Sequence, residues 1–258
     1  DDPAPTFPLP EDAFVGVDEL LYTGFSGLQS ATMRVDLQTG KRTAFVAPKS
    51  SDAAAGGEYD RRPARRRELT PPGNAFLKQR LQAESRRVEW TNAEGLQLYG
   101  VLTVPPESIA KPPYQLVLFP HGGPHSRSSQ GFNFTVQIFA AHGYAVFEPN
   151  FRGSAGYGRK FLDADRKDFG GGDMRDIQSG IESLIARELV DPQRQFVYGV
   201  SYGGFMTCWL VGHTPQFRAA VAQNAVTDLH AMWGLSDIQS WTEWEFGGKP
   251  WEVAETMR

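Results

Sequence analysis

Residues 196–204 read FVYGVSYGG, and this stretch decides the fold. An apolar, β-branched run leads into Ser201, and a helical pattern over 205–211 leads out of it. Glycines on both sides leave room for a sharp strand-to-helix turn that lifts the serine hydroxyl clear of a sheet. A G-x-S-x-G core alone is expected by chance in roughly one chain of this length in ten. The flanking sequence therefore has to support it.

Strands and helices alternate on both sides of this stretch. The apolar patterns predict strands over 114–119, 144–148, 196–200 and 217–222, and helices over 132–141, 174–185 and 205–211. This alternation is typical of an α/β fold in which helices cover both faces of a parallel sheet. Sites in such sheets form at the carboxyl ends of the strands. We therefore searched the loops at those ends for chemistry.

A glycine-rich loop, PHGGPH at 120–125, follows the first of these strands. Attack of a serine on an ester or amide creates an oxyanion, which needs preorganised N–H donors. The usual pair is the N–H after the nucleophile and one from this loop, which here are Tyr202 and Gly123. A tight turn without a ligand is the alternative. His121 is a candidate catalytic base, but its place before the nucleophile favours a structural or oxyanion-loop role.

A second loop, NFRGSAGYG at 150–158, follows the next strand. Arg152 is a candidate for holding a substrate carboxylate or carbonyl, and Tyr157 is a second candidate for substrate contact. Alternatively, Arg152 ties loops together through an acid such as Asp173 or Asp176, and the sequence leaves both roles open. The glycines match neither a dinucleotide fingerprint nor a phosphate loop, so we expect no nucleotide cofactor.

The N-terminal third has a different character. Short strands are expected over 20–23, 32–37 and 42–46, as in a propeller blade or the edge of a sandwich. Residues 50–73 indicate a solvated linker loop, which we favour over a nucleic-acid patch although 61–67 is rich in arginine. A hairpin over 87–90 and 96–102 then opens the second domain.

Composition narrows the function classes. The chain has 258 residues, a net charge of -4 and one cysteine. These values favour neither a nucleic-acid nor a membrane partner and exclude an intrachain disulfide. We expect Cys208 to be a buried structural thiol and the compartment to be the cytoplasm, with a periplasmic location as the alternative. Oligomeric state is not readable.

No cofactor or metal is expected either. The five histidines are dispersed without H-E-x-x-H spacing. The acids Asp163, Asp165, Asp168 and Asp173 lack calcium-loop spacing and are interpreted as a solvated loop.

Seven motifs in order resemble the catalytic domain of the prolyl oligopeptidase family, serine family S9. They lie between Leu116 and Gly248 and just beyond, at 120–125, 150–158, 173–176, 191–194, 199–207, 224–228 and 246–251. The sequence is most similar to acylaminoacyl-peptidase and dipeptidyl-peptidase-like bacterial members. Together the motifs cover about half of the chain.

The resemblance implies an α/β-hydrolase domain, incomplete at its C-terminal end, preceded by the last part of a β-propeller. Residues 1–85 would be the propeller end with its linker, and 86–258 part of the catalytic domain. Ser201 would be the nucleophile of a serine peptidase that acts on short peptides, with Gly123 and Tyr202 forming the oxyanion hole. The chain starts with Asp, not Met, so we expect a fragment or processed product.

The triad order in this fold is Ser, then Asp or Glu, then His. After Ser201 the histidines are His213 and His230, and neither suits the role beside an acid such as Asp228. We therefore expect the triad Asp and His beyond Arg258, which would leave this chain alone catalytically feeble.

Two other functions compete with the peptidase. A carboxylesterase uses the same elbow and oxyanion logic, and a non-catalytic propeller–hydrolase binding module would lack a triad member. An aromatic set is a candidate pocket lining or, more commonly, core: Phe205, Trp209, Trp233, Trp241 and Trp244.

Overall fold

The structure is a computed structural model that describes residues 19–26, 29–36, 38–39, 42–46 and 82–257. The linker expected over 50–73 lies outside the described residues. Among the residues that are described, no helix is long and apolar enough to cross a membrane.

Three N-terminal strands pair antiparallel in the order β1-β2-β3. Their bounds are β1 Glu19–Ser26, β2 Gln29–Asp36 and β3 Arg42–Val46. At the turn after β2, the Asp36 carboxylate accepts hydrogen bonds from the Gln38 and Thr39 N–H groups, at 2.9 and 2.8 Å. These strands overlap those that the sequence predicts over 20–23, 32–37 and 42–46. β1 extends past both predicted ends, and β2 begins three residues earlier than predicted.

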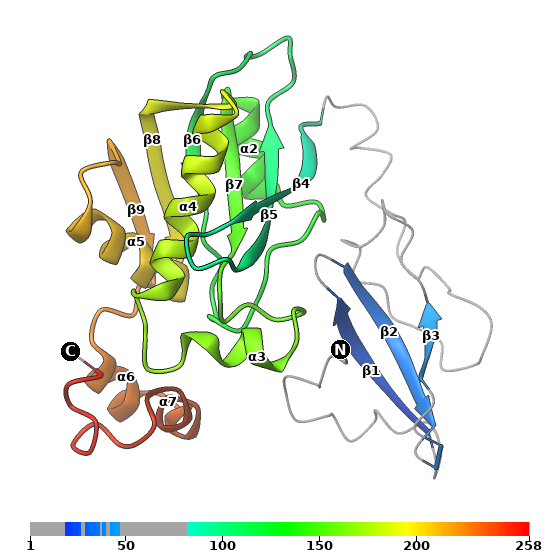
Figure 1. Ribbon diagram of the computed structural model, residues 1–258, viewed down its shortest axis with the longest axis vertical. Coiled ribbons are helices and arrows are strands. Elements are labelled where there is room, and N and C mark those ends of the chain that lie inside the picture. Colours follow the sequence, from blue (N-terminus) through cyan, green and yellow to red (C-terminus); the bar gives the residue numbers. More distant parts are fainter. Residues whose placement is uncertain (1–18, 27–28, 37, 40–41, 47–81, 258) are drawn as a thin grey trace.

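The main sheet has six strands in the order β4-β5-β7-β6-β8-β9 (Figure 1). The strands are β4 Glu84–Thr91, β5 Gln97–Val104, β6 Tyr114–Leu118, β7 Tyr144–Asn150, β8 Val190–Val200 and β9 Ala219–Gln223. β7, β6, β8 and β9 run parallel, as predicted, and the hairpin β4–β5 adds an antiparallel end. The sheet is therefore mixed, as in an α/β-hydrolase.

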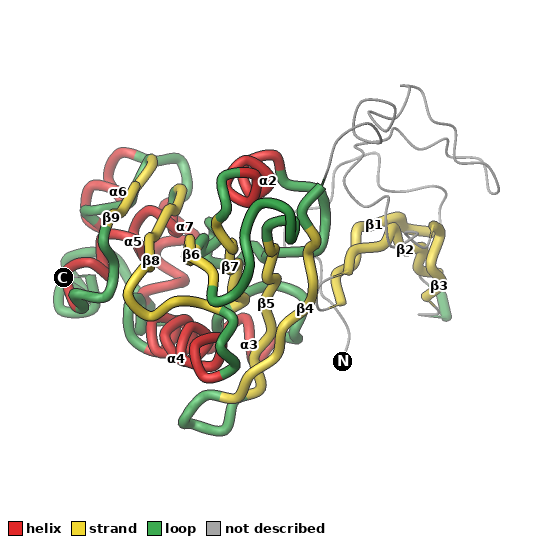
Figure 2. The backbone as a smooth tube through the Cα atoms, turned by 90° about the horizontal axis from the view of Figure 1, so that it is seen from above, coloured by secondary structure: helices red, strands yellow, loops and turns green. Residues whose placement is uncertain are grey.

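Helices cover both faces of this sheet. The helices of the described residues are α2 Phe134–Ala141, α3 Arg159–Leu162, α4 Gly172–Ala186, α5 Tyr202–His213, α6 Leu229–Leu235 and α7 Gln239–Phe246, with a short 3-10 helix, η2, at Asp163–Asp165. Figure 2 shows α2 and α4 on opposite sides of the strands. The prediction of helices on both faces is confirmed.

Alternation along the strands divides the core in two. Leu116 and Leu118 of β6 belong to the buried cluster that includes Ile181 of α4 and Met206 of α5. Val117, between the two leucines, packs instead with Val136 of α2. Since successive side chains of a strand point to opposite faces, this five-residue strand is buried on both sides.

Caps account for the shifted start of α2. The Asn133 side chain accepts hydrogen bonds from the N–H groups of Thr135 and Val136. An N-cap residue has non-helical dihedrals, so the helix begins at Phe134 and not at 132 as the apolar pattern suggests. α5 likewise starts earlier than its apolar pattern, directly after Ser201.

The edge strand β9 and the cysteine on α5 are solvent-exposed. All five residues of β9 are exposed, and Val221 keeps 55% of its surface accessible. Cys208 is exposed as well, so the expectation of a buried thiol is wrong. Its side chain lies on the outward face of α5, which the apolar character of the helix on all sides conceals.

We predict that Leu116→Ala lowers the free energy of unfolding by about 2–5 kcal/mol, because it opens a cavity in a fully buried site. Leu235→Ala is the matched control, since Leu235 is 88% exposed and its truncation should change stability by less than about 0.5 kcal/mol. Denaturant titration measures both. Equal effects of the two variants would contradict the assigned core.

Candidate active site

Ser201 occupies the turn between β8 and α5 with φ 61° and ψ −120°. A positive φ is rare for a residue other than glycine and costs about 1–3 kcal/mol. The Ser201 N–H donates to the Gln223 carbonyl of β9 at 3.0 Å, which holds the strained turn in place. The side chain is exposed. The turn therefore presents the hydroxyl to solvent at the carboxyl edge of the sheet.

Three glycines let backbone segments approach this turn. A Cβ on Gly199 would lie 2.0 Å from the Gly203 carbonyl oxygen, and one on Gly203 would lie 2.2 Å from the Pro120 carbonyl oxygen. A Cβ on Gly204 would lie 2.8 Å from the Gln223 carbonyl oxygen. Real Cβ atoms do not come so close to backbone atoms, so each position requires glycine.

The loop at 120–125 lies directly beside the serine. A Cβ built on Gly122 would be 3.5 Å from the Ser201 Cβ. Gly123 has φ +121°, and a Cβ there would clash with the His125 and Ser126 nitrogens at 2.5 and 2.6 Å. The sequence predicted that these segments meet, and the structure brings them together.

The two candidate oxyanion donors have no competing acceptor. Among the described residues, neither the Tyr202 N–H nor the Gly123 N–H donates a hydrogen bond. Tyr202 is the first residue of α5, where N–H groups lack partners within the helix. Two unpaired N–H groups beside an exposed hydroxyl are what an oxyanion hole requires.

His121 is a partly buried residue that supports this loop. Its Nδ1 lies 2.8 Å from the Gly122 carbonyl oxygen, and its Nε2 lies 2.8 Å from Ser154 Oγ. Burial lowers the pKa of His121 to about 4, so the ring is neutral. Because a carbonyl only accepts, Nδ1 carries the proton. Ser154 Oγ also lies 2.6 Å from the Phe151 carbonyl oxygen, so His121 Nε2 and that carbonyl compete for the single hydroxyl proton.

This arrangement orients the candidate oxyanion donor. In a trans peptide the C=O and the following N–H point in opposite directions. Holding the Gly122 carbonyl on the His121 ring therefore turns the Gly123 N–H the other way. The His121 ring is itself stacked on Phe151, with centroids 4.4 Å apart. Its contacts are those of a positioning residue, and both ring nitrogens are engaged.

Asp173 fixes the side chain of Tyr202. The Tyr202 hydroxyl donates to Asp173 Oδ2, and the same oxygen accepts from the Gly170 N–H at 3.1 Å. Burial raises the pKa of Asp173 to about 7 and that of Tyr202 well above its usual value. Asp173 and Asp165 are fully buried. The interpretation of these acids as a solvated loop is therefore wrong for both, because Asp165 lies buried in η2 and Asp173 lies buried in the first turn of α4.

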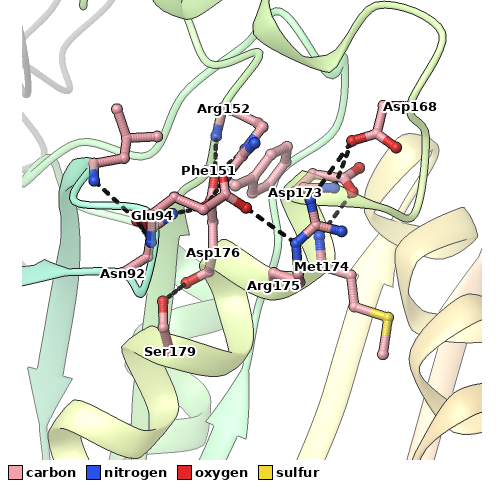
Figure 3. Close-up of polar contacts among 12 residues, drawn as sticks. Asn92, Glu94, Phe151, Arg152, Asp168, Asp173, Met174, Arg175, Asp176 and Ser179 are labelled. Atoms are coloured by element: carbon pink, nitrogen blue, oxygen red, sulfur yellow. Dashed lines mark hydrogen bonds and ion pairs between the residues drawn. The ribbon is translucent and has the colours of Figure 1, made fainter.

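Arg152 lies in a polar network with Asp176 (Figure 3). Its Nε and Nη2 donate to the two oxygens of Asp176, at 2.9 and 2.8 Å, and Nη2 also reaches Glu94 at 2.9 Å. The Arg152 N–H and Asn92 Nδ2 complete four hydrogen bonds to the fully buried Asp176. These are the contacts of the structural alternative. A substrate contact of Arg152 stays a prediction.

Tyr157 is held by Asn150 at the end of β7. Its hydroxyl accepts from Asn150 Nδ2 at 2.9 Å, and its ring stacks on Tyr99 with centroids 5.5 Å apart. Burial raises the pKa of Tyr157 to about 12. Asn150 also bonds both backbone groups of Ser128. Tyr157 thus stabilises the loop beyond 125, and its substrate role stays a prediction too.

A pocket of about 540 Å³ lies beside the elbow. Its lining includes Pro120, His121, Gly122, Glu148 and Val200. Burial raises the pKa of Glu148 to about 8, which leaves a largely protonated carboxyl in the pocket at neutral pH. Sequence reasoning did not single out Glu148. Its only signal is a lone acid inside the apolar run of β7.

The candidate bases after Ser201 are engaged elsewhere. His213 is exposed and its Nδ1 donates to the Trp209 carbonyl at 2.8 Å. His230 is exposed, and Asp228 caps α6 by accepting from the Ala231 N–H. Within the part of the chain that the structure describes, the Ser201 hydroxyl has no hydrogen-bond partner. No histidine in this part is therefore paired with Ser201.

The aromatic set does not form one pocket. Phe205 and Trp209 line a second pocket of about 360 Å³. Trp241 and Trp244 instead flank His125, with ring centroids 6.2 and 5.4 Å away. The fifth member, Trp233, packs edge-on against Trp251.

We predict that Gly203→Ala destabilises the fold by about 1–3 kcal/mol or more, because the new Cβ meets the Pro120 carbonyl. Gly212→Ala on the same helix is the control. A Cβ at Gly212 meets nothing within 4 Å, so helix propensity should stabilise this variant by about 0.5 kcal/mol. Thermal and denaturant unfolding distinguish them. A neutral Gly203→Ala would refute the close approach.

We also predict that Glu148→Gln becomes more stabilising as pH rises from about 4.5 to 8. The folded pKa of Glu148, about 8, exceeds its usual value of 4.5, so the folded state binds more protons in this window. As pH rises through this window, the carboxyl ionises in the unfolded chain while the folded state keeps its proton. The wild type therefore loses stability with rising pH, and the glutamine variant does not. Unfolding free energies of wild type, Glu148→Gln and the exposed control Glu182→Gln at several pH values test this. A difference independent of pH would contradict it.

Comparison with known proteins agrees with this geometry. The model of the prolyl oligopeptidase family matches residues 130–258. The uncharacterized peptidase YuxL of Bacillus subtilis is 35% identical, over 74% of this chain and 29% of its own length. The acylamino-acid-releasing enzyme of Sus scrofa is 33% identical, over 59% of this chain and 21% of its own length.

A solved structure shows the same fold. The acylaminoacyl peptidase of Pyrococcus horikoshii superimposes with a TM-score of 0.79 at 25% identity, covering 94% of this chain and 41% of that one. The chain thus spans less than a third of the length of the curated relatives named above. With the family model matching half of its residues, the chain belongs to the prolyl oligopeptidase family.

Proposed function

We propose that Ser201 is the nucleophile of a serine peptidase that cleaves short peptides through an acyl-enzyme. The observation that carries the proposal is the exposed hydroxyl on a strained strand-to-helix turn beside two unpaired N–H groups. Membership of a peptidase family supports the reaction class. The names of the relatives, a peptidase and an acylamino-acid-releasing enzyme, support peptide substrates.

The chemistry follows from this geometry. Ser201 Oγ attacks the carbonyl carbon of the scissile amide while its proton passes to a histidine. The carbonyl oxygen becomes an oxyanion and accepts hydrogen bonds from the N–H groups of Tyr202 and Gly123. Collapse breaks the C–N bond, and the amine leaves with the proton held by the histidine. Water then cleaves the acyl-enzyme by the same route.

We place the histidine and its aspartate beyond Arg258. The engaged or exposed histidines after Ser201 support this, as does the fraction of the relatives' length that the chain spans. We further assign 1–85 to the end of a β-propeller with its linker and 86–258 to the catalytic domain. A cytoplasmic location is part of the proposal.

The test compares a peptide amide with an ester of the same acyl group, using the full-length protein that carries this sequence. Both should be hydrolysed, and Ser201→Ala should lower kcat by about 10³-fold or more. Ser240→Ala is the control, because Ser240 is exposed on α7 away from the elbow and should leave kcat unchanged.

Four results would overturn parts of the proposal. Retained turnover in Ser201→Ala would exclude this serine as nucleophile. Cleavage of the ester without the amide would favour a carboxylesterase, and no turnover of either would favour a binding module. The 258-residue chain alone should give no acylation burst, and a normal burst would place the base within it.

A further inference from the structure

Three ionisable side chains meet beside the glycine-rich loop. His125 comes from that loop, Asp165 from η2 and Glu245 from α7. His125 Nε2 lies 3.6 Å from Asp165 Oδ1 and 3.3 Å from Glu245 Oε2. One ligand atom from each side chain falls within 4.8 Å of the others. The segments are 40 and 80 residues apart, so the fold alone assembles this group.

The group is buried, and its side-chain polar atoms that face one another lack hydrogen-bond partners. Asp165 and Glu245 are fully buried, and His125 keeps only 16% of its side chain accessible. Both oxygens of each carboxylate and the His125 Nε2 are buried without a hydrogen bond. Leaving a buried polar atom unsatisfied costs about 1–3 kcal/mol, and more if it is charged. Five such atoms in one buried cluster indicate a missing partner.

No described cation supplies that partner. Among the described residues, neither Asp165 nor Glu245 forms an ion pair with lysine or arginine. Arg166, the nearest candidate in sequence, donates from Nε and Nη2 to the Trp244 carbonyl and lies over the Trp244 ring at 4.3 Å. Two buried carboxylates therefore share a single imidazole.

The separations of the two carboxylate oxygens from His125 Nε2 are compatible with a tetrahedral metal. Zinc bonds to imidazole nitrogen and carboxylate oxygen are about 2.0–2.1 Å long, which places neighbouring ligand atoms about 3.3 Å apart. The two printed separations from His125 Nε2, 3.3 and 3.6 Å, agree with this value. A mixed set of imidazole and carboxylates suits zinc or manganese, whereas calcium and magnesium prefer oxygen alone.

We propose that His125, Asp165 and Glu245 bind one divalent first-row cation, zinc or manganese, which links the glycine-rich loop to η2 and α7. Gly153 makes room for the site, because a Cβ there would lie 2.1 Å from Asp165 Oδ2. Trp241 and Trp244 hold the His125 ring edge-on. His125 is two residues after Gly123, so the cation would also brace the loop beside Ser201.

The test is a titration of the full-length protein, stripped with a chelator, with Zn²⁺ and separately with Mn²⁺. We expect one ion per chain by calorimetry and by metal analysis after desalting, together with a higher thermal midpoint. Glu245→Gln and Asp165→Asn should weaken binding by about 100-fold or more. Glu243→Gln is the matched control, since this residue lies on the same helix and its amide can still accept from Trp233 Nε1.

The metal-free variants separate the proposal from a purely structural role. Removing one buried carboxylate should make metal-free Glu245→Gln at least as stable as the metal-free wild type, while abolishing the gain in thermal midpoint on adding Zn²⁺. A structural role alone predicts a less stable variant and no gain in either protein, and that result would overturn the site.

A spectroscopic measurement on the wild type keeps the proposal testable if the variants do not fold. Co²⁺ added to the stripped protein should give the intense visible absorption of a tetrahedral site. Absence of saturable Zn²⁺ and Mn²⁺ binding, or binding that is equal in wild type and Glu245→Gln, would overturn the proposal. So would a Co²⁺ spectrum of the aqueous ion alone.

Discussion

Close contact between backbone segments at the start of α5 is the constraint on which the site depends. Because Gly199, Gly203 and Gly204 carry no Cβ, the backbones of β8, of the loop after β6 and of the end of β9 can approach the start of α5 closely. The same packing holds Ser201 at φ 61°. A strained turn persists only where its surroundings over-determine it. Here those surroundings are the backbone of α5, of β9 and of the loop that follows β6.

Helix α4 anchors two segments near this turn, the start of α5 and the loop at 150–158. Asp173, in its first turn, holds the Tyr202 side chain, and Asp176, three residues later, holds Arg152. Residues three apart lie on the same face of a helix, so one face of α4 contacts both segments. Removing one partner of a buried ion pair costs about 3–5 kcal/mol. The polar network therefore fixes loop positions that apolar packing alone would leave free.

Sequence reasoning reached the alternating strands and helices around the elbow because periodicity and glycine spacing are local signals. The meeting of Gly122 with Ser201 was predictable, since the carboxyl ends of adjacent parallel strands share one edge. The role of Arg152 was left open between a substrate contact and a structural tie to Asp173 or Asp176, because sequence does not show which side chains an arginine meets. In the folded chain its guanidinium donates to both oxygens of Asp176.

Three other features could not be predicted from local sequence patterns. Asp165 has no apolar period around it, so nothing marks its burial before the chain is folded. Cys208 sits on a helix that is apolar on all sides, which hides its exposed face. The group of His125, Asp165 and Glu245 combines three distant segments, so motif spacing could not find it.

The central claim is that the turn presents Ser201 as a nucleophile beside an oxyanion hole. The most direct measurement is intact-mass and peptide analysis of the full-length protein after treatment with a fluorophosphonate. We predict one adduct per chain, located on Ser201, and none in Ser201→Ala. An adduct on another residue that persists in Ser201→Ala, or no adduct on a folded wild type, would contradict the account.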